Sequence, residues 1–406
     1  MKKTLWTRDY TLLMTATALG AVGGIAGSFA LSFLVFDKTG STLASALILA
    51  IQFIPGFLIP TFLAPWMDRL PRKPFLVAGD AINGVLYTAA GFYLLLRPFR
   101  YGEYVAFSFF LSCLGSFDSL AYSSIYPNLI PEGMEEKGYT VSGMLYPVMQ
   151  VIMMPVAALL LETVGTARIL IGQGILALIA ALLESRIRVN EQNRMGGEKF
   201  SFRLWYGDLK DGAAYLKKEK GLQGIYSYEA ITNGIATGYG PLMIAFFRTM
   251  PGMSSFLYAL FSVAEFLGRS LGGVFCYRVE IPKKKKYGFA FLVYQVYECM
   301  DMVLLWLPYP LMLLNRGICG FLGINSATMR TAAVQRYIPD EYRARINAFE
   351  SILILAASSI GSLAVGALGE FVDYRVCMTL CGGVTLLGCW LTIWRKRKEI
   401  HTIYES

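Results

Sequence analysis

Long apolar segments recur along the whole chain and are separated by short polar links. Each is about as long as the roughly 20 residues that a helix needs to cross ~30 Å of hydrocarbon at ~1.5 Å per residue. In lipid, a single segment satisfies its own backbone hydrogen bonds only as a helix. The pattern therefore predicts an all-α membrane protein with twelve transmembrane helices, over residues 10–36, 43–66, 74–96, 104–130, 138–162, 167–188, 221–247, 254–279, 287–306, 309–336, 346–370 and 374–394.

The one long polar link lies between the sixth and seventh segments, over residues 191–220. Apolar residues recur there at helical spacing beside Lys and Asp, which is typical of an amphipathic helix lying along a bilayer surface. These residues are Leu204, Leu209, Ala213 and Leu216. We expect the link to be cytoplasmic and to separate an N-terminal six-helix bundle, residues 1–190, from a C-terminal one, residues 221–395, with a cytoplasmic tail over 396–406.

Composition and charge agree with a membrane protein. Of the 406 residues, 55% are hydrophobic and only 16% are charged, which is too apolar for an ordinary soluble domain. The net charge of +9 comes from Lys and Arg in the links, and most of these lie on one side of the membrane if the N-terminus is cytoplasmic. We therefore expect a multi-pass protein of the inner (cytoplasmic) cell membrane, with both termini cytoplasmic, lipid as its surroundings and no nucleic-acid partner.

Residue types exclude several classes of site. The single His, His401, leaves no His-based metal site or catalytic triad. The seven Cys lie singly in apolar segments, as small hydrophobic residues do. The first segment holds Gly20, Gly23, Gly24 and Gly27, but no strand precedes them and no Lys-Ser or Lys-Thr pair follows, so they indicate close helix packing and not a nucleotide loop. We expect no metal, no cofactor and no enzymatic activity.

The link between the second and third segments reads WMDRLPRK, residues 66–73. Its acid, Asp68, is followed by the cations Arg69, Arg72 and Lys73 on a link too short to form a domain. Charges at a helix end can interact with the positive N-terminus of a neighbouring helix and with carboxylates there. The link is therefore either a contact that holds two halves of the protein closed or a solvated charge run that sets the topology.

The two halves of the chain repeat each other. A shift of 212 residues lays Asp68 on Glu280, so an acid followed by a basic cluster closes the second segment of each half. A shift of 208 residues lays Glu162 on Glu370. We therefore predict two six-helix pseudo-repeats, an arrangement found in membrane transporters.

With these features the chain resembles the major facilitator superfamily, and within it the bacterial drug, macrolide and siderophore exporters. The resemblance covers nearly the full length and rests on APWMDRLPRK at the second link, DLKDGAAYLKKEKGL before the seventh segment and IPDEYRARINAF before the eleventh. It implies the major facilitator fold and secondary transport of a small molecule by alternating access. The chain departs from the family pattern in its fourth segment, FLSCLGSFDSL, which lacks the Arg that many proton-coupled members carry.

For the link at Asp68, the resemblance implies a conformational latch between helices 2 and 11. The cytoplasmic start of helix 11 carries Arg343, Arg345 and Glu350. The gating candidates are Asp68, Arg69, Arg72, Lys73, Glu280, Lys284 and Glu350.

Ionisable residues also lie well inside the apolar segments, where burial costs at least ~2.5 kcal/mol each unless they face a cavity or a partner. They are Asp118, Glu265, Arg269, Glu298, Asp301 and Arg316. Depth counting places Arg316 level with Asp301. Glu265 and Arg269, four residues apart, share a helix face near the level of Glu298. The C-terminal residues therefore form a structural ion-pair network joining helices 8, 9 and 10, or they leave one acid under-compensated to carry a proton.

Asp118 differs because no Lys or Arg lies at its depth in the first six segments. It either faces the central cavity, with a role in proton or substrate binding, or is satisfied by Ser and Tyr hydroxyls. Nearer the cytoplasmic side, Asp80 with Asn83 and Glu229 with Asn233 are expected to cap helices and to bond neighbouring ones.

A cavity for a bulky, partly apolar molecule needs aromatic and amide groups. The candidates are Gln52, Tyr122, Tyr126, Tyr146, Gln150, Asn233, Tyr239, Tyr258, Tyr294 and Tyr297. Each is also explained by helix packing or by an interfacial belt. As a set they favour an amphipathic organic ligand over a sugar or an inorganic ion.

The leading hypothesis is therefore a monomeric secondary transporter that exports a drug-like, macrolide-like or siderophore-like molecule in exchange for protons. An uncoupled facilitator or importer of a small metabolite is a second hypothesis, favoured by the missing fourth-segment Arg. A membrane sensor or scaffold that does not transport is a third.

Overall fold

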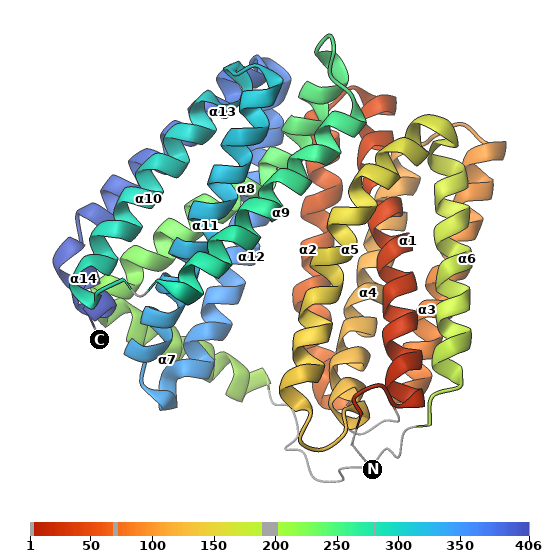
Figure 1. Ribbon diagram of the computed structural model, residues 1–406, viewed down its shortest axis with the longest axis horizontal. Coiled ribbons are helices and arrows are strands. Elements are labelled where there is room, and N and C mark those ends of the chain that lie inside the picture. Colours follow the sequence, from red (N-terminus) through yellow and green to blue (C-terminus); the bar gives the residue numbers. More distant parts are fainter. Residues whose placement is uncertain (1–3, 68–71, 189–201, 280, 406) are drawn as a thin grey trace. The chain divides into compact units, whose positions relative to one another are not determined.

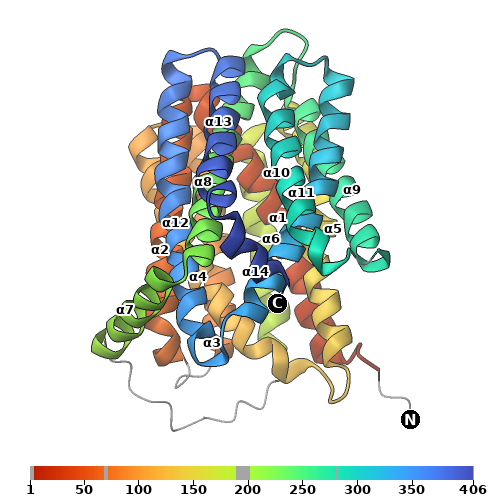
Figure 2. The same cartoon turned by 90° about the vertical axis from the view of Figure 1, so that its left-hand side faces the viewer.

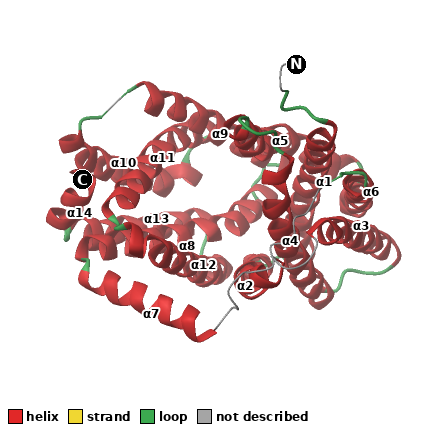
Figure 3. Cartoon of the chain, turned by 90° about the horizontal axis from the view of Figure 1, so that it is seen from below, coloured by secondary structure: helices red, strands yellow, loops and turns green. Residues whose placement is uncertain are grey.

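The computed structural model of the chain describes residues 4–67, 72–188, 202–279 and 281–405. Within these ranges the chain consists of helices and short connections without strands (Figure 3). All twelve predicted segments are helical, with ends within a few residues of those expected, and a further helix lies in the long polar link. The helices are α1 (Arg8–Thr39), α2 (Thr42–Met67), α3 (Arg72–Leu96), α4 (Tyr101–Leu129), α5 (Glu135–Thr163), α6 (Gly165–Ser185), α7 (Phe202–Lys218), α8 (Lys220–Thr249), α9 (Ser255–Arg278), α10 (Lys283–Val303), η1 (Leu304–Trp306), α11 (Tyr309–Tyr337), α12 (Asp340–Phe371), α13 (Tyr374–Cys389), η2 (Trp390–Trp394) and α14 (Arg397–Glu405).

Among the described residues, nine helices are long and apolar enough to cross a membrane. They are α1, α3 to α6, α9, α10 with η1, α12, and α13 with η2. Of the other predicted spans, α2 has only part of its side chains described, whereas α8 and α11 are equally long but more polar. The polar residues of α8 and α11 matter because several of them line the cavity described below.

Contacts divide the chain into two compact units. Unit 1 consists of Met1–Gly40, Ile51–Phe200 and Ser254–Ala259, and unit 2 of Ser41–Ala50, Ser201–Met253 and Leu260–Ser406. Unit 1 thus contains α1, most of α2 and α3 to α6, and unit 2 contains α7, α8, most of α9 and α10 to α14. Each unit also includes one short segment that is distant in the sequence.

In unit 1, α6 packs along both α1 and α3 (Figure 1). Small residues allow the backbones to approach closely, as is common between membrane helices. A Cβ atom on Gly91 would lie only 2.6 Å from the carbonyl oxygen of Ala167. In α1, Gly23 and Gly27 pack against Gln173 of α6, so these two glycines serve the close packing expected of them.

In unit 2, α8 packs along α12, and α10 packs along α13. A Cβ atom on Gly234 of α8 would lie 2.8 Å from the carbonyl oxygen of Ala357. Most of the segment expected to be a tail forms α14, which contacts α8, α10 and α11 (Figure 2). Ile400, Ile403 and Tyr404 of this helix are buried. Burial of this apolar face stabilises a helix that is too short to persist alone.

Two acids at equivalent positions of the predicted repeat bind the short segments that complete each unit. In unit 2, Glu370 near the end of α12 accepts hydrogen bonds from the Ser41 hydroxyl (2.8 Å) and the Leu43 amide (2.9 Å), at the start of α2. In unit 1, Glu162 near the end of α5 accepts one from the hydroxyl of Ser255, the first residue of α9 (2.6 Å). A carboxylate at a helix N-terminus pairs with otherwise unsatisfied groups and with the helix dipole. The shift of 208 residues therefore aligns two helix caps.

Replacing Glu370 with alanine is expected to loosen the start of α2. The Leu43 amide loses its acceptor, at a cost of about 1–3 kcal/mol, so its hydrogen exchange should accelerate by roughly 5- to 150-fold. Hydrogen-exchange mass spectrometry of the purified protein measures this. Glu162→Ala is the matched control, since it removes the cap in unit 1 and leaves Glu370 intact. Unchanged exchange at Leu43 in Glu370→Ala would contradict the cap.

Candidate functional site

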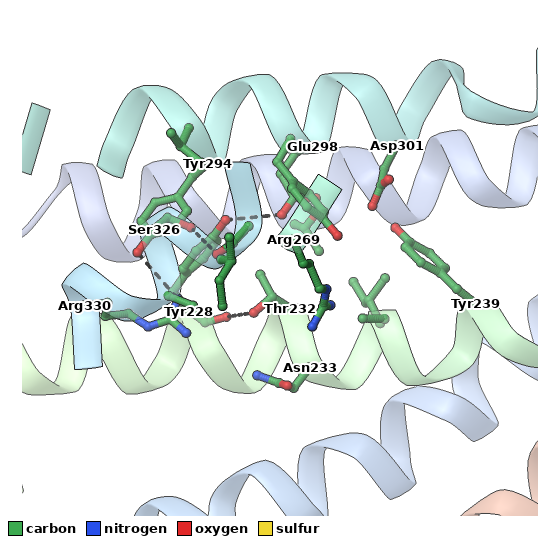
Figure 4. Close-up of a pocket in the computed structure, with 18 of the residues that line it drawn as sticks. Tyr228, Thr232, Asn233, Tyr239, Arg269, Tyr294, Glu298, Asp301, Ser326 and Arg330 are labelled. Atoms are coloured by element: carbon green, nitrogen blue, oxygen red, sulfur yellow. Dashed lines mark hydrogen bonds between the residues drawn. The ribbon is translucent and has the colours of Figure 1, made fainter. Parts of the chain in front are cut away.

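A cavity in unit 2 lies among α8, α9, α10, α11 and α13 (Figure 4). We call it the unit 2 cavity. It has a volume of about 290 Å³ and combines tyrosines with charged side chains. Its aromatic and ionisable lining residues are Tyr228, Tyr239, Arg269, Tyr294, Tyr297, Glu298, Asp301, Arg316 and Arg330.

A chain of ion pairs runs along one side of this cavity. Arg316 of α11 contacts Asp301 of α10 at 3.2 Å and Glu265 of α9 at 3.1 Å. Glu265 also pairs with Arg269 of its own helix at 2.6 Å. Arg316 thus pairs with the acid at its own depth, as the depth comparison predicts. The chain contains two arginines and two acids, so its charges balance.

A second buried ion pair joins α11 to α8. Arg330 of α11 contacts Glu229 at 2.6 Å and donates to the hydroxyl of Tyr294 at 3.5 Å. Both charged side chains are largely buried, with exposures of 17% and 8%. Glu229 was expected to cap its helix and to bond neighbouring helices. Arg330 was not singled out, because its position near the end of a predicted span is also that of a topology-setting cation.

Glu298 is the acid of this cavity that no described Lys or Arg pairs with. It is 5% exposed, and one carboxylate oxygen accepts a hydrogen bond from the Tyr228 hydroxyl at 3.2 Å. The other oxygen accepts one from the hydroxyl of Thr385 in α13. Figure 4 shows Glu298 with Tyr228 to its left and Asp301 to its right, and Arg269 is drawn directly below it. Burying a charge without a counter-charge is costly, so Glu298 is suited to carry a proton in one state and to release it in another.

Unit 1 contains a second cavity, which we call the unit 1 cavity, among α1, α3, α4, α5 and α6, with a volume of about 590 Å³. Three acids line it: Asp80 from α3, Asp118 from α4 and Glu184 from α6. Asp118 therefore faces a cavity within unit 1; its predicted place in a central cavity stays a prediction. Asp80 and Asn83, expected to cap helices and to bond neighbouring ones, line the same space.

Glu184 was missed by sequence reasoning. It lies in the last turn of its helix, close to the cations Arg186 and Arg188, and that position is also typical of an exposed boundary residue. In the fold it is 3% exposed. An acid one residue from the end of its helix is therefore a weak signal by itself.

The predicted cavity residues divide among several places. Asn233, Tyr239, Tyr294 and Tyr297 line the unit 2 cavity, and Tyr122 and Tyr146 line the unit 1 cavity. Tyr126 is 2% exposed and bonds to Tyr10, and Tyr258 packs against Phe29 and Phe33. Gln52 and Gln150 are exposed and line neither cavity. Packing explains Tyr126 and Tyr258.

Of the gating candidates, Asp68, Arg69 and Glu280 lie outside the described residues. Arg72 and Lys73 donate to the backbone carbonyls of Ser124 (3.1 Å) and Ser185 (2.7 Å) within unit 1.

In unit 2, Lys284 is exposed in the first turn of α10. Glu350 of α12 lies close enough to Glu229 and Arg330 to interact with them electrostatically. The latch between the second and eleventh predicted spans, which are α2 and α12, stays a prediction.

Residues 230–405 match the family model of the Major Facilitator Superfamily. Macrolide efflux protein A of Streptococcus pyogenes is 24% identical over 224 residues, which make up 54% of this chain and 52% of that protein. The chain therefore spans about half the length of the curated relatives it matches.

Solved structures share the fold over nearly the whole chain. The nucleoside transporter NupG has a TM-score of 0.73 at 11% identity, covering 96% of this chain and 99% of its own. A peptide transporter POT has a TM-score of 0.71 at 10% identity, covering 100% and 98%. Both are transporters and not enzymes. The predicted resemblance is therefore confirmed: the protein is a multi-pass membrane protein with the major facilitator fold, and its residues 230–405 match the Major Facilitator Superfamily.

Proposed function

We propose that the protein is a secondary transporter that works by alternating access and exports an amphipathic organic small molecule in exchange for protons. The observation that carries this proposal is the setting of Glu298. It lines a cavity, is almost fully buried, and has hydroxyl partners where its neighbours Asp301 and Glu265 have arginines. Intramembrane acids in such settings serve as proton carriers in pumps and transporters.

The lining of the two cavities supports an amphipathic substrate. Each combines several tyrosines with a few polar groups and aliphatic side chains, the composition typical of sites for organic ligands. A relative that is named a macrolide efflux protein supports the direction of transport and the substrate class.

The remaining features of the proposal concern placement and gating. We place the protein in the inner membrane as a monomer with both termini cytoplasmic, because the positive-inside rule favours this orientation. The link at Asp68 and its counterpart at Glu280 would act as cytoplasmic gates. In this mechanism the hydrogen bonds that Glu370 accepts at the start of α2, and that Glu162 accepts at the start of α9, would break and re-form as the protein changes conformation.

Purified protein in liposomes tests the proposal. An imposed pH gradient should drive accumulation of amphipathic dyes, and a protonophore should reduce the flux to that of protein-free liposomes. Flux that is indifferent to the gradient would instead indicate the uncoupled facilitator or importer. Absence of flux for cationic, neutral and anionic dyes alike would favour the sensor or scaffold and overturn the proposal.

A further inference from the structure

The two cavities differ in charge. In the unit 2 cavity, Arg269, Arg316 and Arg330 line the same space as the acids. In the unit 1 cavity, none of the described lining residues is Lys, Arg or His, although three are acids. Arg72 and Lys73, at the start of α3, donate to backbone carbonyls and do not line the cavity. When its three acids are ionised, the unit 1 cavity therefore carries negative charge that no described lining residue balances.

The unsatisfied polar atoms of this cavity are all oxygen acceptors. Asp118 Oδ1 and Glu184 Oε2 have no hydrogen-bond partner, and neither has the amide oxygen Oε1 of Gln173. Glu184 and Gln173 are 3% and 8% exposed, so bulk water does not readily satisfy them. A buried acceptor without a donor costs about 1–3 kcal/mol. These three acceptors thus lack donors, and the described lining of the cavity lacks positive charge.

A protonated amine supplies both. An alkylammonium group carries one positive charge and up to three N–H donors without an acceptor. The acids approach from three helices, and Asp118 lies beside Gly79, the neighbour of Asp80, with Asp118 Oδ1 3.5 Å from the position of a Cβ atom there. Carboxyl groups from three helices can approach a compact cation from several sides.

The rest of the cavity suits the apolar body of a ligand. Tyr87, Tyr122 and Tyr146 line it together with Leu76 and Leu111. Aromatic faces attract cations, and aliphatic side chains pack against hydrocarbon. The volume of about 590 Å³ lies within the range of roughly 300–1,000 Å³ that holds drug-sized molecules.

We propose that the unit 1 cavity binds the ammonium group of the transported molecule at Asp118 and Glu184, so that the substrate is an amphipathic organic cation. This inference rests on the proposed function and assigns its substrate class. It gives the two units different tasks: unit 1 recognises the charge of the substrate, and unit 2 carries the coupling proton at Glu298.

Binding of three probes with a common dansyl body tests the charge assignment. Dansylcadaverine carries a primary ammonium group, its N-acetyl derivative is neutral, and dansyl-aminocaproic acid is anionic. The purified full-length protein should bind the first at least about tenfold more tightly than the others, since each factor of ten needs only about 1.4 kcal/mol. Equal binding of the ammonium and acetamide probes would overturn the inference.

Variants locate the site. Asp118→Asn and Glu184→Gln should each weaken binding of dansylcadaverine by about tenfold or more and leave the weak binding of the acetamide probe unchanged. Glu103→Gln is the matched control in unit 1, because Glu103 pairs with Arg100 on the surface at the start of α4. The two variants lie on different helices, so one that fails to fold leaves the other as a test. Undiminished binding in either folded variant would contradict the assignment.

Transport of the same probes separates this inference from the proposed function. In proteoliposomes with a pH gradient, corrected for protein-free liposomes, preferential movement of the ammonium probe supports both. Equal transport of all three probes retains the transporter and overturns the cationic substrate. A preference for the ammonium probe in binding, without transport, retains the site and contradicts the proposed function.

Discussion

Replacing Arg316 with glutamine should destabilise the protein by roughly 3–5 kcal/mol, the usual cost of leaving a buried charge without its partner. Arg316 is the sole described ion-pair partner of Asp301, whose side chain is 3% exposed, and it also contacts Glu265. Its loss removes the ion pairs that link α11 to α9 and α10. Thermal or denaturant unfolding of the purified protein in detergent measures the effect.

Arg269→Gln is the matched control for this variant. Arg269 also pairs with Glu265, but its side chain is 58% exposed, and exposed ion pairs contribute only about 0–1 kcal/mol. Neutralising Asp301 and Glu265 together with Arg316 should recover much of the loss, because no buried charge is then left alone. Equal losses for Arg316→Gln and Arg269→Gln would show that the chain of ion pairs does not stabilise the fold.

Glu298→Gln should abolish transport that is driven by a pH gradient and retain exchange of substrate across the membrane. Glutamine has nearly the same size and keeps an oxygen that accepts from the Tyr228 hydroxyl, but it cannot bind and release a proton. The measurement compares gradient-driven flux with counterflow of labelled substrate in the same proteoliposomes.

Tyr228→Phe distinguishes the effect of the carboxyl group of Glu298 from the effect of its hydrogen-bond partner. This change removes one hydrogen bond to Glu298 and leaves the group able to titrate, so coupling should persist with a shifted pH dependence. If Glu298→Gln transports with full dependence on the gradient, Glu298 is not the coupling acid, and the proton must be carried elsewhere.

Depth along a helix was predictable from the sequence. The apolar segments locate the twelve spans, because the length needed to cross hydrocarbon is set by the helical rise. Counting from their ends also placed Arg316 level with Asp301, and the two side chains form an ion pair. The recurrence that aligns Glu162 with Glu370 likewise marks two acids with the same capping role.

Direction around a helix was much less predictable. Tyr126 and Tyr122 are four residues apart on α4 and stack on each other, yet Tyr122 lines the unit 1 cavity and Tyr126 is buried in packing. Gln52 and Gln150 have suitable side chains but line neither cavity. A single sequence of nearly uniform hydrophobicity carries little signal for which face of a span meets protein and which meets lipid.

The sequence by itself thus determined the positions and approximate lengths of the helices in the twelve predicted segments, and the relative level of Arg316 and Asp301, since these follow from the one-dimensional pattern of apolar and charged residues. Only the tertiary structure decided which acids have a counter-charge. Glu298 has hydroxyls from α8 and α13 as partners where Asp301, three residues later on the same helix, has an arginine from α11. The cluster of Asp80, Asp118 and Glu184 likewise requires three helices to pack side by side. Whether a buried carboxyl is paired depends on contacts between distant segments, and the choice of packing partners is not a property of any one segment.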